Sequence, residues 1–434
     1  MNLQPSPFNM IKSGEKTIEL RLNDEKRQKL KTGDEIEFIL TDGKTDRLNV
    51  KITNIYHFDN FRQLYKSLPL LKCGYTKDDI STAGPDDMDV YYSPEKQRKY
   101  GVLGIEIKPV EEKAATANKR RTNMSLDRLI EKIAEKQNPT VAGLDPKLDY
   151  VPASIKAKCF EKYGKTLDGA AAALLEFNKA LIDSLYDIVP AIKPQAAYYE
   201  MYGWQGVKAL CDTISYAKSK GMYVMTDGKR NDIGTTMEAY VTAHLGTTDV
   251  DGEQIEAFGA DALTVNGYLG TDGIKPLANI CKEKDKGIFV LVKTSNPSSG
   301  ELQDMKLDTN ETVYEHMGKM CENWGSELMG KYGYSAIGAV VGATYPEQLL
   351  EMREKAKHTF FLVPGYGAQG GGAEDVKNAF DKNGLGAIIN SSRGIMCAWK
   401  KQGLTEEDFA KAARNEAIRM RDEIVETIGE ISLK

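Results

Sequence analysis

The feature that most constrains the fold of this chain is a regular alternation between residue 140 and the C-terminus. Short apolar runs that suit buried strands alternate with longer amphipathic segments that suit helices. We expect eight strands, at residues 140–145, 191–195, 223–229, 261–266, 288–295, 336–344, 360–367 and 386–392. The expected helices include 170–188, 204–220, 313–331, 346–356 and 406–428. Eight βα units in roughly 300 residues predict an α/β fold, a closed (β/α)8 TIM barrel rather than an open doubly wound sheet.

Charged residues follow the third of these strands, in the segment 223–236, which reads YVMTDGKRNDIGTT. Residues two apart on a strand point to the same face, so Asp227 and Lys229 are expected to converge on one pocket. The glycine and asparagine residues around them place Asp232 and Thr236 on the next loop or the first helical turn. An ordinary solvated charge cluster is the alternative, because Asp and Lys are common on surfaces.

Two glycine-rich segments follow the last two strands. VPGYGAQGGG covers residues 363–372, and SSRG covers residues 391–394. Glycine lets backbone N–H groups approach an anion, and Arg393 can make a two-pronged contact with it. Barrels commonly bind phosphate after strands seven and eight. These segments therefore predict a phosphate site, with tight turns that need glycine as the alternative.

The most specific functional signal is a set of six motifs in a fixed order: TVAGLDP, AIKPQ, MTDGKRNDIGTT, VKTSNPSSG, VPGYGAQGG and INSSRG. Together they resemble the orotidine 5'-monophosphate decarboxylases whose core motif reads D-x-K-R-x-D-I-G, over residues from about Met124 to the C-terminus. The catalytic residues that the resemblance implies are Lys229, Asp227, Asp232 and Lys193. The implied substrate-binding residues are Asp145, Thr236, Ser295, Pro364, Gln369, Arg393 and Gly394.

The same resemblance implies a role for several of these residues. Asp145 and Lys193 would contact the ribose hydroxyls, and Ser295 would hydrogen-bond the pyrimidine. Gln369 and Arg393 would hold the 5'-phosphate. The residues at positions 232 and 236 reach into the neighbouring subunit's site in such enzymes, so a homodimer with shared active sites is expected.

The implied reaction converts orotidine 5'-monophosphate to UMP in de novo pyrimidine biosynthesis, with Lys229 protonating C6. We expect no cofactor and no metal, because the four histidines lie outside the motifs and the six cysteines lack C-x-x-C spacing. One alternative is a Mg²⁺-dependent sugar-phosphate decarboxylase or aldolase of the same superfamily. Another is an RNA-binding regulatory protein with a non-catalytic barrel. The intact set of charged residues argues against an inactive barrel.

Residues 1–110 differ from the rest, because alternating apolar strands dominate them and short helices interrupt the strands. GEKTIELRL, KTGDEIEF and KYGVLGIEI resemble the ASCH domain, a compact β-barrel related to the PUA RNA-binding fold. ASCH hydrolases of N4-acetylcytidine use a Lys and a Thr three residues apart, and here Lys16 is followed by Glu19. Lys16, Glu19 and Arg21 predict either a nucleotide or RNA cleft or a solvated face with internal ion pairs.

A polar stretch at 111–123 is expected to link this module to a decarboxylase barrel at 124–434, so the chain reads as a fusion. The 434-residue length suits two domains, and a formal net charge of -5 argues against a generic nucleic-acid binder. No run of 18 apolar residues and no signal-peptide core is found, so a cytoplasmic protein is expected. Asn296 and the residues after it are candidates for a mobile lid.

Overall fold

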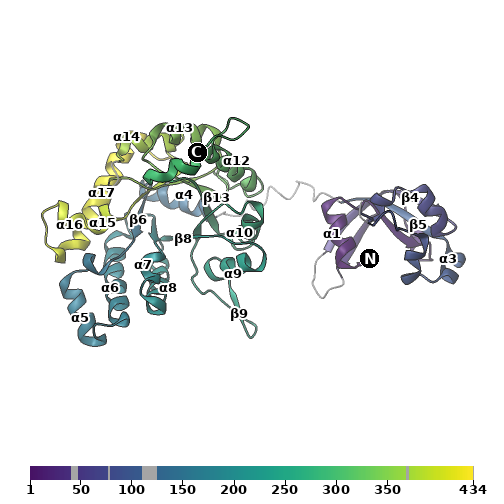
Figure 1. Ribbon diagram of the computed structural model, residues 1–434, viewed down its shortest axis with the longest axis horizontal. Coiled ribbons are helices and arrows are strands. Elements are labelled where there is room, and N and C mark those ends of the chain that lie inside the picture. The colour runs from purple at the N-terminus through teal and green to yellow at the C-terminus, as the bar shows by residue number, and fades with distance from the viewer. Residues whose placement is uncertain (41–46, 77–78, 110–124, 368–370, 434) are drawn as a thin grey trace. The chain divides into compact units, whose positions relative to one another are not determined.

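The computed structural model describes residues 1–40, 47–76, 79–109, 125–367 and 371–433. The chain divides into two compact units, Met1–Lys119 and Arg120–Lys434 (Figure 1). The predicted linker 111–123 and Met124 lie outside the described residues, so the exact domain boundaries stay a prediction.

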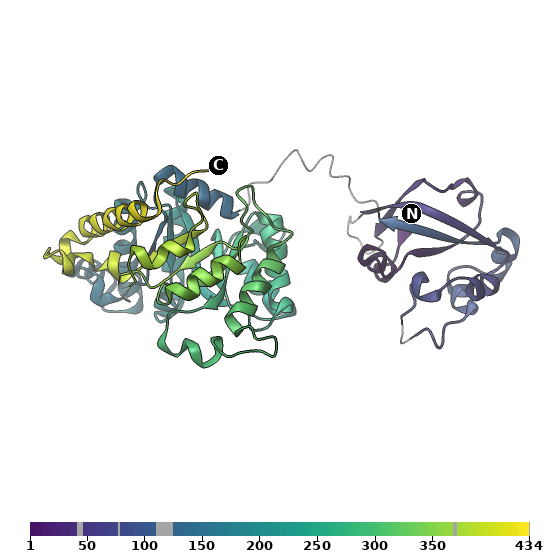
Figure 2. The ribbon, with the colours of Figure 1, turned by 90° about the horizontal axis from the view of Figure 1, so that it is seen from above.

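The N-terminal unit is built on a curved five-stranded sheet (Figure 2). Its strands run in the order β1-β3-β4-β5-β2, with β1 parallel to β3 and the other neighbours antiparallel. The strands are β1 (Asn2–Leu3), β2 (Ile18–Leu22), β3 (Glu35–Leu40), β4 (Arg47–Phe58) and β5 (Val102–Pro109), and the helices are α1 (Pro5–Ser13), α2 (Phe61–Ser67) and α3 (Pro94–Tyr100). Short 3-10 turns cover η1 (Arg27–Lys29), η2 (Leu70–Cys73) and η3 (Pro85–Val90). Alternate residues of β3 are buried, as expected for a sheet with one apolar face.

The C-terminal unit is a closed barrel of eight parallel strands, which confirms the predicted (β/α)8 fold. The strands are β6 (Thr140–Leu144), β7 (Ala191–Pro194), β8 (Tyr223–Arg230), β11 (Ala262–Val265), β12 (Gly287–Lys293), β13 (Ile337–Val341), β14 (Phe361–Val363) and β15 (Ala387–Ser391). Nearly every strand residue is buried, because side chains fill the barrel on one face and helices cover the other. A short antiparallel hairpin, β9 (Thr248–Val250) and β10 (Glu253–Ile255), is added after the third barrel strand.

Helices surround the strands of this barrel in Figure 1. They are α5 (Ala153–Tyr163), α6 (Leu167–Leu185), α7 (Ala197–Glu200), α8 (Gly203–Ser219), α9 (Gly234–His244), α10 (Thr271–Lys284), α11 (Gly300–Gln303), α12 (Val313–Gly325), α13 (Pro346–Lys355), α14 (Ala373–Val376), α15 (Arg393–Met396), α16 (Ala398–Lys401) and α17 (Phe409–Ile428). Short 3-10 turns lie at η4 (Leu148–Tyr150), η5 (Pro297–Ser299), η6 (Lys377–Ala379) and η7 (Glu406–Asp408). The largest difference from the predicted helices concerns the one expected at 313–331, because α12 ends at Gly325. Gly325 packs so closely on Ser335 that a Cβ would lie 2.3 Å from Ser335 Oγ.

Helix α4 (Ser125–Lys136) closes the amino-terminal end of the barrel. Its apolar side chains share a buried cluster with the first residues of several strands, among them Val141, Ala191 and Tyr223. The hydroxyl of Ser125 lies 2.7 Å from the hydroxyl of Tyr223. This hydrogen bond holds the helix against the amino-terminal end of the barrel. Because this end is filled, the open carboxyl ends of the strands are left for chemistry.

Candidate active site

A cavity of about 190 Å³ opens at the carboxyl ends of the barrel strands. Its walls come from strand ends or the loops after them: Asp145, Tyr150, Lys193, Tyr198, Asp227, Pro364, Gly365, Tyr366, Asn390, Ser392 and Arg393. Five of these were singled out from the sequence, namely Asp145, Lys193, Asp227, Pro364 and Arg393. Segments up to about 250 residues apart along the chain therefore meet here because parallel strands of a barrel end on the same rim.

Asp227, in the second half of β8, lies between two lysines. Lys193 Nζ donates to Asp227 Oδ2 over 2.6 Å, and Lys229 Nζ donates to Asp227 Oδ1 over 2.7 Å. Asp227 and Lys193 are buried and line the cavity, whereas the side chain of Lys229 is 46% exposed and is not part of the lining. The three residues form a charged row that runs from the barrel interior to solvent.

Burial and charge act in opposite directions on this row. Burial alone would raise the pKa of Asp227, but the positive charges of Lys193 and then Lys229 lower it well below the ordinary carboxyl value. Burial alone would lower the pKa of Lys193, yet the charges of Asp227 and Asp145 raise it above its usual range. At neutral pH, Asp227 is therefore a carboxylate and Lys193 an ammonium.

Two further residues hold the Asp227 carboxylate, and neither was assigned a role from the sequence. Gln195 Nε2 donates to Asp227 Oδ2 over 2.9 Å, and Thr264 Oγ1 donates to Asp227 Oδ1 over 2.7 Å. Gln195 follows Lys193 by two positions, and that strand spacing was a usable signal. Thr264 lies on a different strand, β11, and carries no local signal of its own.

Two buried acceptor atoms that line or adjoin the cavity have no hydrogen-bond partner among the described residues. They are Oδ1 of Asp145 and Oδ1 of Asn390. Leaving a buried acceptor unpaired is costly, so these atoms suit a ligand that brings hydroxyl or N–H donors. A sugar is one such ligand.

Ser295 does not line this cavity but lies on the loop after β12. Lys293 anchors this loop. Its side chain is 1% exposed, and its Nζ donates a hydrogen bond to Asp304 Oδ1 over 2.6 Å. Ser295 also packs on Gly342, where a Cβ would lie 3.0 Å from Ser295 Cβ. The predicted lid motion of this loop stays a prediction.

The remaining predicted residues are placed differently from the charged row. Asp232 precedes α9 and Thr236 lies exposed in its first turn, as expected, but neither lines the cavity of its own chain. Gly394 is buried, and a Cβ there would lie 2.4 Å from Ser391 Oγ. Gln369 lies outside the described residues.

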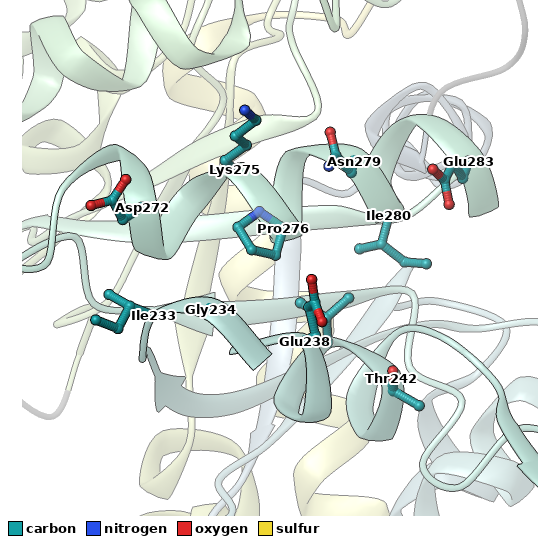
Figure 3. A pocket seen from close by; sticks show the side chains of 11 residues that line it. Ile233, Gly234, Glu238, Thr242, Asp272, Lys275, Pro276, Asn279, Ile280 and Glu283 are labelled. Atoms are coloured by element: carbon teal, nitrogen blue, oxygen red, sulfur yellow. The ribbon is translucent and has the colours of Figure 1, made fainter. Parts of the chain in front are cut away.

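A larger hollow of about 740 Å³ lies between α9 and α10. Figure 3 shows Pro276 and Ile280 of α10 facing α9, and Glu238 of α9 pointing toward α10. The residues that line this hollow include none of the charged row. The smaller cavity is therefore the candidate active site despite its size.

In the N-terminal unit, the three residues singled out from the sequence contact one another. Glu19 is buried and forms ion pairs with Lys16, whose Nζ lies 3.0 Å from Glu19 Oε2, and with Arg21, whose Nε lies 2.8 Å from Glu19 Oε1. The internal ion pairing is therefore present, but the face is not solvated, because Lys16 is buried as well. The hydroxyl of Thr17 is buried beside them with no hydrogen-bond partner among the described residues.

Comparison with known proteins agrees with this geometry. The model of the orotidine 5'-phosphate decarboxylase / HUMPS family matches residues 169–404, and the ASCH domain model matches residues 1–111. The orotidine 5'-phosphate decarboxylase of Rhodopirellula baltica is 43% identical over 289 residues, which cover 66% of this chain and 93% of the relative. The chain belongs to the orotidine 5'-phosphate decarboxylase family.

Other members of the family agree over the same region. The orotidine 5'-phosphate decarboxylase of Clostridium tetani is 42% identical over 305 residues, covering 70% of this chain and 99% of the relative. The structure of Leishmania donovani OMP decarboxylase is similar with a TM-score of 0.52 and 30% identity, covering 69% of this chain and 99% of that chain. The two family models thus match separate parts of the chain, the decarboxylase model within the C-terminal unit and the ASCH model within the N-terminal unit.

Proposed function

We propose that the barrel decarboxylates orotidine 5'-monophosphate to UMP without a cofactor. The observation that carries the proposal is the row of Lys193, Asp227 and Lys229 at the strand ends, in a chain of this family. The row offers a half-exposed cation and a carboxylate that stays ionised. These are the groups that a decarboxylation with no electron sink requires.

The chemistry follows from where the electrons go. Breaking the bond between C6 and the carboxylate releases CO2 and leaves an electron pair on C6, in the ring plane and out of conjugation with the carbonyls. A lysine ammonium beside C6 offsets this charge and then donates the proton that completes UMP. Lys229 is the exposed end of the row and takes this role, while Asp227 orients it.

The other residues of the cavity fit the rest of the nucleotide. Asp145, with its unpaired Oδ1, and Lys193 are assigned to the ribose hydroxyls. Arg393 and Pro364, which line the cavity, are assigned to the 5'-phosphate together with Gly394 and with Gln369, which lies outside the described residues. Binding the phosphate and ribose far from C6 lets remote binding energy support the reacting geometry. Ser295, which lies on the loop after β12 and does not line the cavity, is assigned to the pyrimidine.

An ultraviolet assay that follows loss of orotidine 5'-monophosphate, with and without EDTA, tests this function. We expect turnover that EDTA leaves unchanged. Loss of turnover with EDTA would favour the Mg²⁺-dependent alternative, and no turnover in either condition would favour a non-catalytic barrel. Both oxygens of Asp227 already accept lysine ammonium groups, which argues against Asp227 as a metal ligand.

We also propose that two copies form a homodimer in which Asp232 and Thr236 complete the partner's site. Asp232 lies outside its own cavity, and among the described residues its carboxylate accepts only the N–H of Ile233. Ile233 is 53% exposed beside the hollow of Figure 3. An apolar side chain at this place is suited to an interface.

For the ASCH domain we propose a nucleotide or RNA ligand. Buried ion clusters add little to stability, so Lys16, Glu19 and Arg21 with the unpaired Thr17 hydroxyl are better suited to ligand recognition. The test compares the full chain with a chain that begins at Met124, by titration with cytidine nucleosides and short RNA. Binding by the full chain alone is expected, and no binding at millimolar ligand would contradict the proposal.

The truncated chain also tests independence of the two units. We expect it to fold, dimerise and decarboxylate at close to the full-length rate, because α4 and all eight barrel strands remain. An insoluble or inactive product would show that the barrel needs the ASCH domain. A cytoplasmic location likewise stays our proposal; in the described part of the chain, no helix is long and apolar enough to cross a bilayer.

A further inference from the structure

The register of the pairing between β8 and β11 shifts beside the charged row of Lys193, Asp227 and Lys229. Leu263 of β11 faces Thr226 of β8, but Val265 faces Arg230. The single residue between them on β11, Thr264, therefore stands opposite the three residues 227–229. Such a bulge interrupts the backbone ladder and redirects side chains, and bulges are common beside active sites.

The bulge has a visible effect on the backbone of Lys229. Its φ angle is 48°, in the left-handed region that non-glycine residues seldom adopt. A residue stays in this region only when its surroundings hold it there. The long side chain of Lys229 cannot do so by itself, because nearly half of it is exposed.

Thr264 supplies the contacts that the interrupted ladder lacks. Its side chain is buried, and its Oγ1 accepts the backbone N–H of Lys229 at 3.0 Å. The same hydroxyl donates to Asp227 Oδ1, the oxygen that accepts the Lys229 ammonium. One hydroxyl group thus ties together the backbone of Lys229 and the carboxylate that orients its Nζ.

We propose that Thr264 is a positioning residue for the decarboxylation, acting through Lys229 and Asp227 rather than on the substrate. It holds Lys229 in its left-handed conformation and fixes the rotation of the Asp227 carboxylate. The proposal rests on the proposed function of the barrel. It predicts that the hydroxyl is needed for turnover and not for nucleotide binding.

The test compares three variants of the full-length protein. Thr264→Val keeps the branched shape and removes the hydroxyl, and we expect kcat to fall about 10- to 100-fold, the size of effect that a small misplacement of a catalytic group produces. The KM for orotidine 5'-monophosphate and the Kd of UMP should change less than about threefold, because no group assigned to the phosphate or ribose is altered. Thr264→Ser keeps the hydroxyl and should retain a kcat within about threefold of the wild type.

Thr226→Val is the matched control. Thr226 is also buried, one residue from Asp227, but its Oγ1 has no hydrogen-bond partner among the described residues. We expect no change in its kcat. Wild-type kcat in Thr264→Val, or equal losses in the Thr264→Val and Thr226→Val proteins, would overturn the proposal.

Two further measurements cover the cases in which Thr264→Val does not fold or the wild type is inactive. If Thr264→Val fails to fold, Thr264→Ala replaces it, and a kcat no lower than that of Thr264→Ser would overturn the proposal. If the wild type does not turn over orotidine 5'-monophosphate, the proposed function fails by itself. The rate at which an amine-directed reagent modifies Lys229, mapped by mass spectrometry, then tests the positioning alone: it should change in Thr264→Val and not in Thr226→Val.

Discussion

Lys193 and Lys229 bind opposite oxygens of one carboxylate, that of Asp227, at 2.6 and 2.7 Å. The two lysines differ in their surroundings, since Lys193 is buried in the cavity wall and the side chain of Lys229 is half exposed. We propose that this difference separates their functions: Lys193 neutralises the buried carboxylate, and Lys229 meets the substrate. The first three predictions test this division.

Replacing Lys229 by Ala should lower kcat by at least about 10³-fold, because the variant lacks both the cation beside C6 and the proton donor. Binding of UMP should persist, since the residues assigned to phosphate and ribose are intact. Steady-state kinetics and UMP titration measure the two effects. A variant with near-normal kcat would exclude Lys229 as the proton donor.

Replacing Lys193 by Met should lower the free energy of unfolding by about 3 to 5 kcal/mol, because it leaves a buried carboxylate with one of its two charged partners missing. Lys229→Met should cost less than about 1 kcal/mol, because water screens a half-exposed pair. Urea denaturation of both proteins measures the contrast. Equal losses in the two variants would contradict the assigned burial.

The depressed pKa of Asp227 makes a prediction about acid stability. A carboxyl whose pKa is lower in the folded state contributes stability that is present above its unfolded pKa, near 3.9, and is lost as the pH falls through the folded pKa. The difference in free energy of unfolding between the wild type and Asp227→Asn should therefore be largest above about pH 5 and shrink below about pH 4. Urea titrations from pH 7 to pH 3 measure it, and a difference that stays constant would be evidence against the shift.

Arg393 lines the cavity at the N-terminus of α15 and is assigned to the phosphate. Arg393→Ala should raise KM strongly and reduce transition-state stabilisation, read from kcat/KM, by about 2 to 5 kcal/mol. Lys400→Ala, a basic residue nearby in sequence that does not line the cavity, serves as the control. Barely changed kinetics of Arg393→Ala would place the phosphate elsewhere.

The shared-site proposal predicts complementation. The Asp232→Ala and Lys229→Ala proteins should each be inactive, yet a mixture that exchanges subunits should regain part of the activity. The reason is that one of the two sites in each hybrid dimer contains both intact residues. If heterodimers form and no activity returns, Asp232 acts within its own chain.

The sequence by itself determined the barrel and the positions of the charged residues along the chain. Strand periodicity and strand-end motifs are local properties, so the amino-acid pattern alone assigns Asp145, Lys193, Asp227 and Arg393 to the strand ends. The same local reasoning placed Thr236 on the loop after the strand or in the first helical turn, and it lies in the first turn of α9. It overestimated the length of the helix that begins at Val313. The close approach of Gly325 to Ser335 is a contact between separate segments, which a local pattern does not record.

Only the tertiary structure decided how the charged row is held. The simple expectation for Asp227 and Lys229 was a regular strand with both side chains on one face, but the two residues meet through a bulge and a left-handed backbone. That geometry depends on the register between β8 and β11 and on the Thr264 hydroxyl, 35 residues further along the chain. Register between strands distant in sequence is set by packing of the whole barrel, and no local pattern around Lys229 records it.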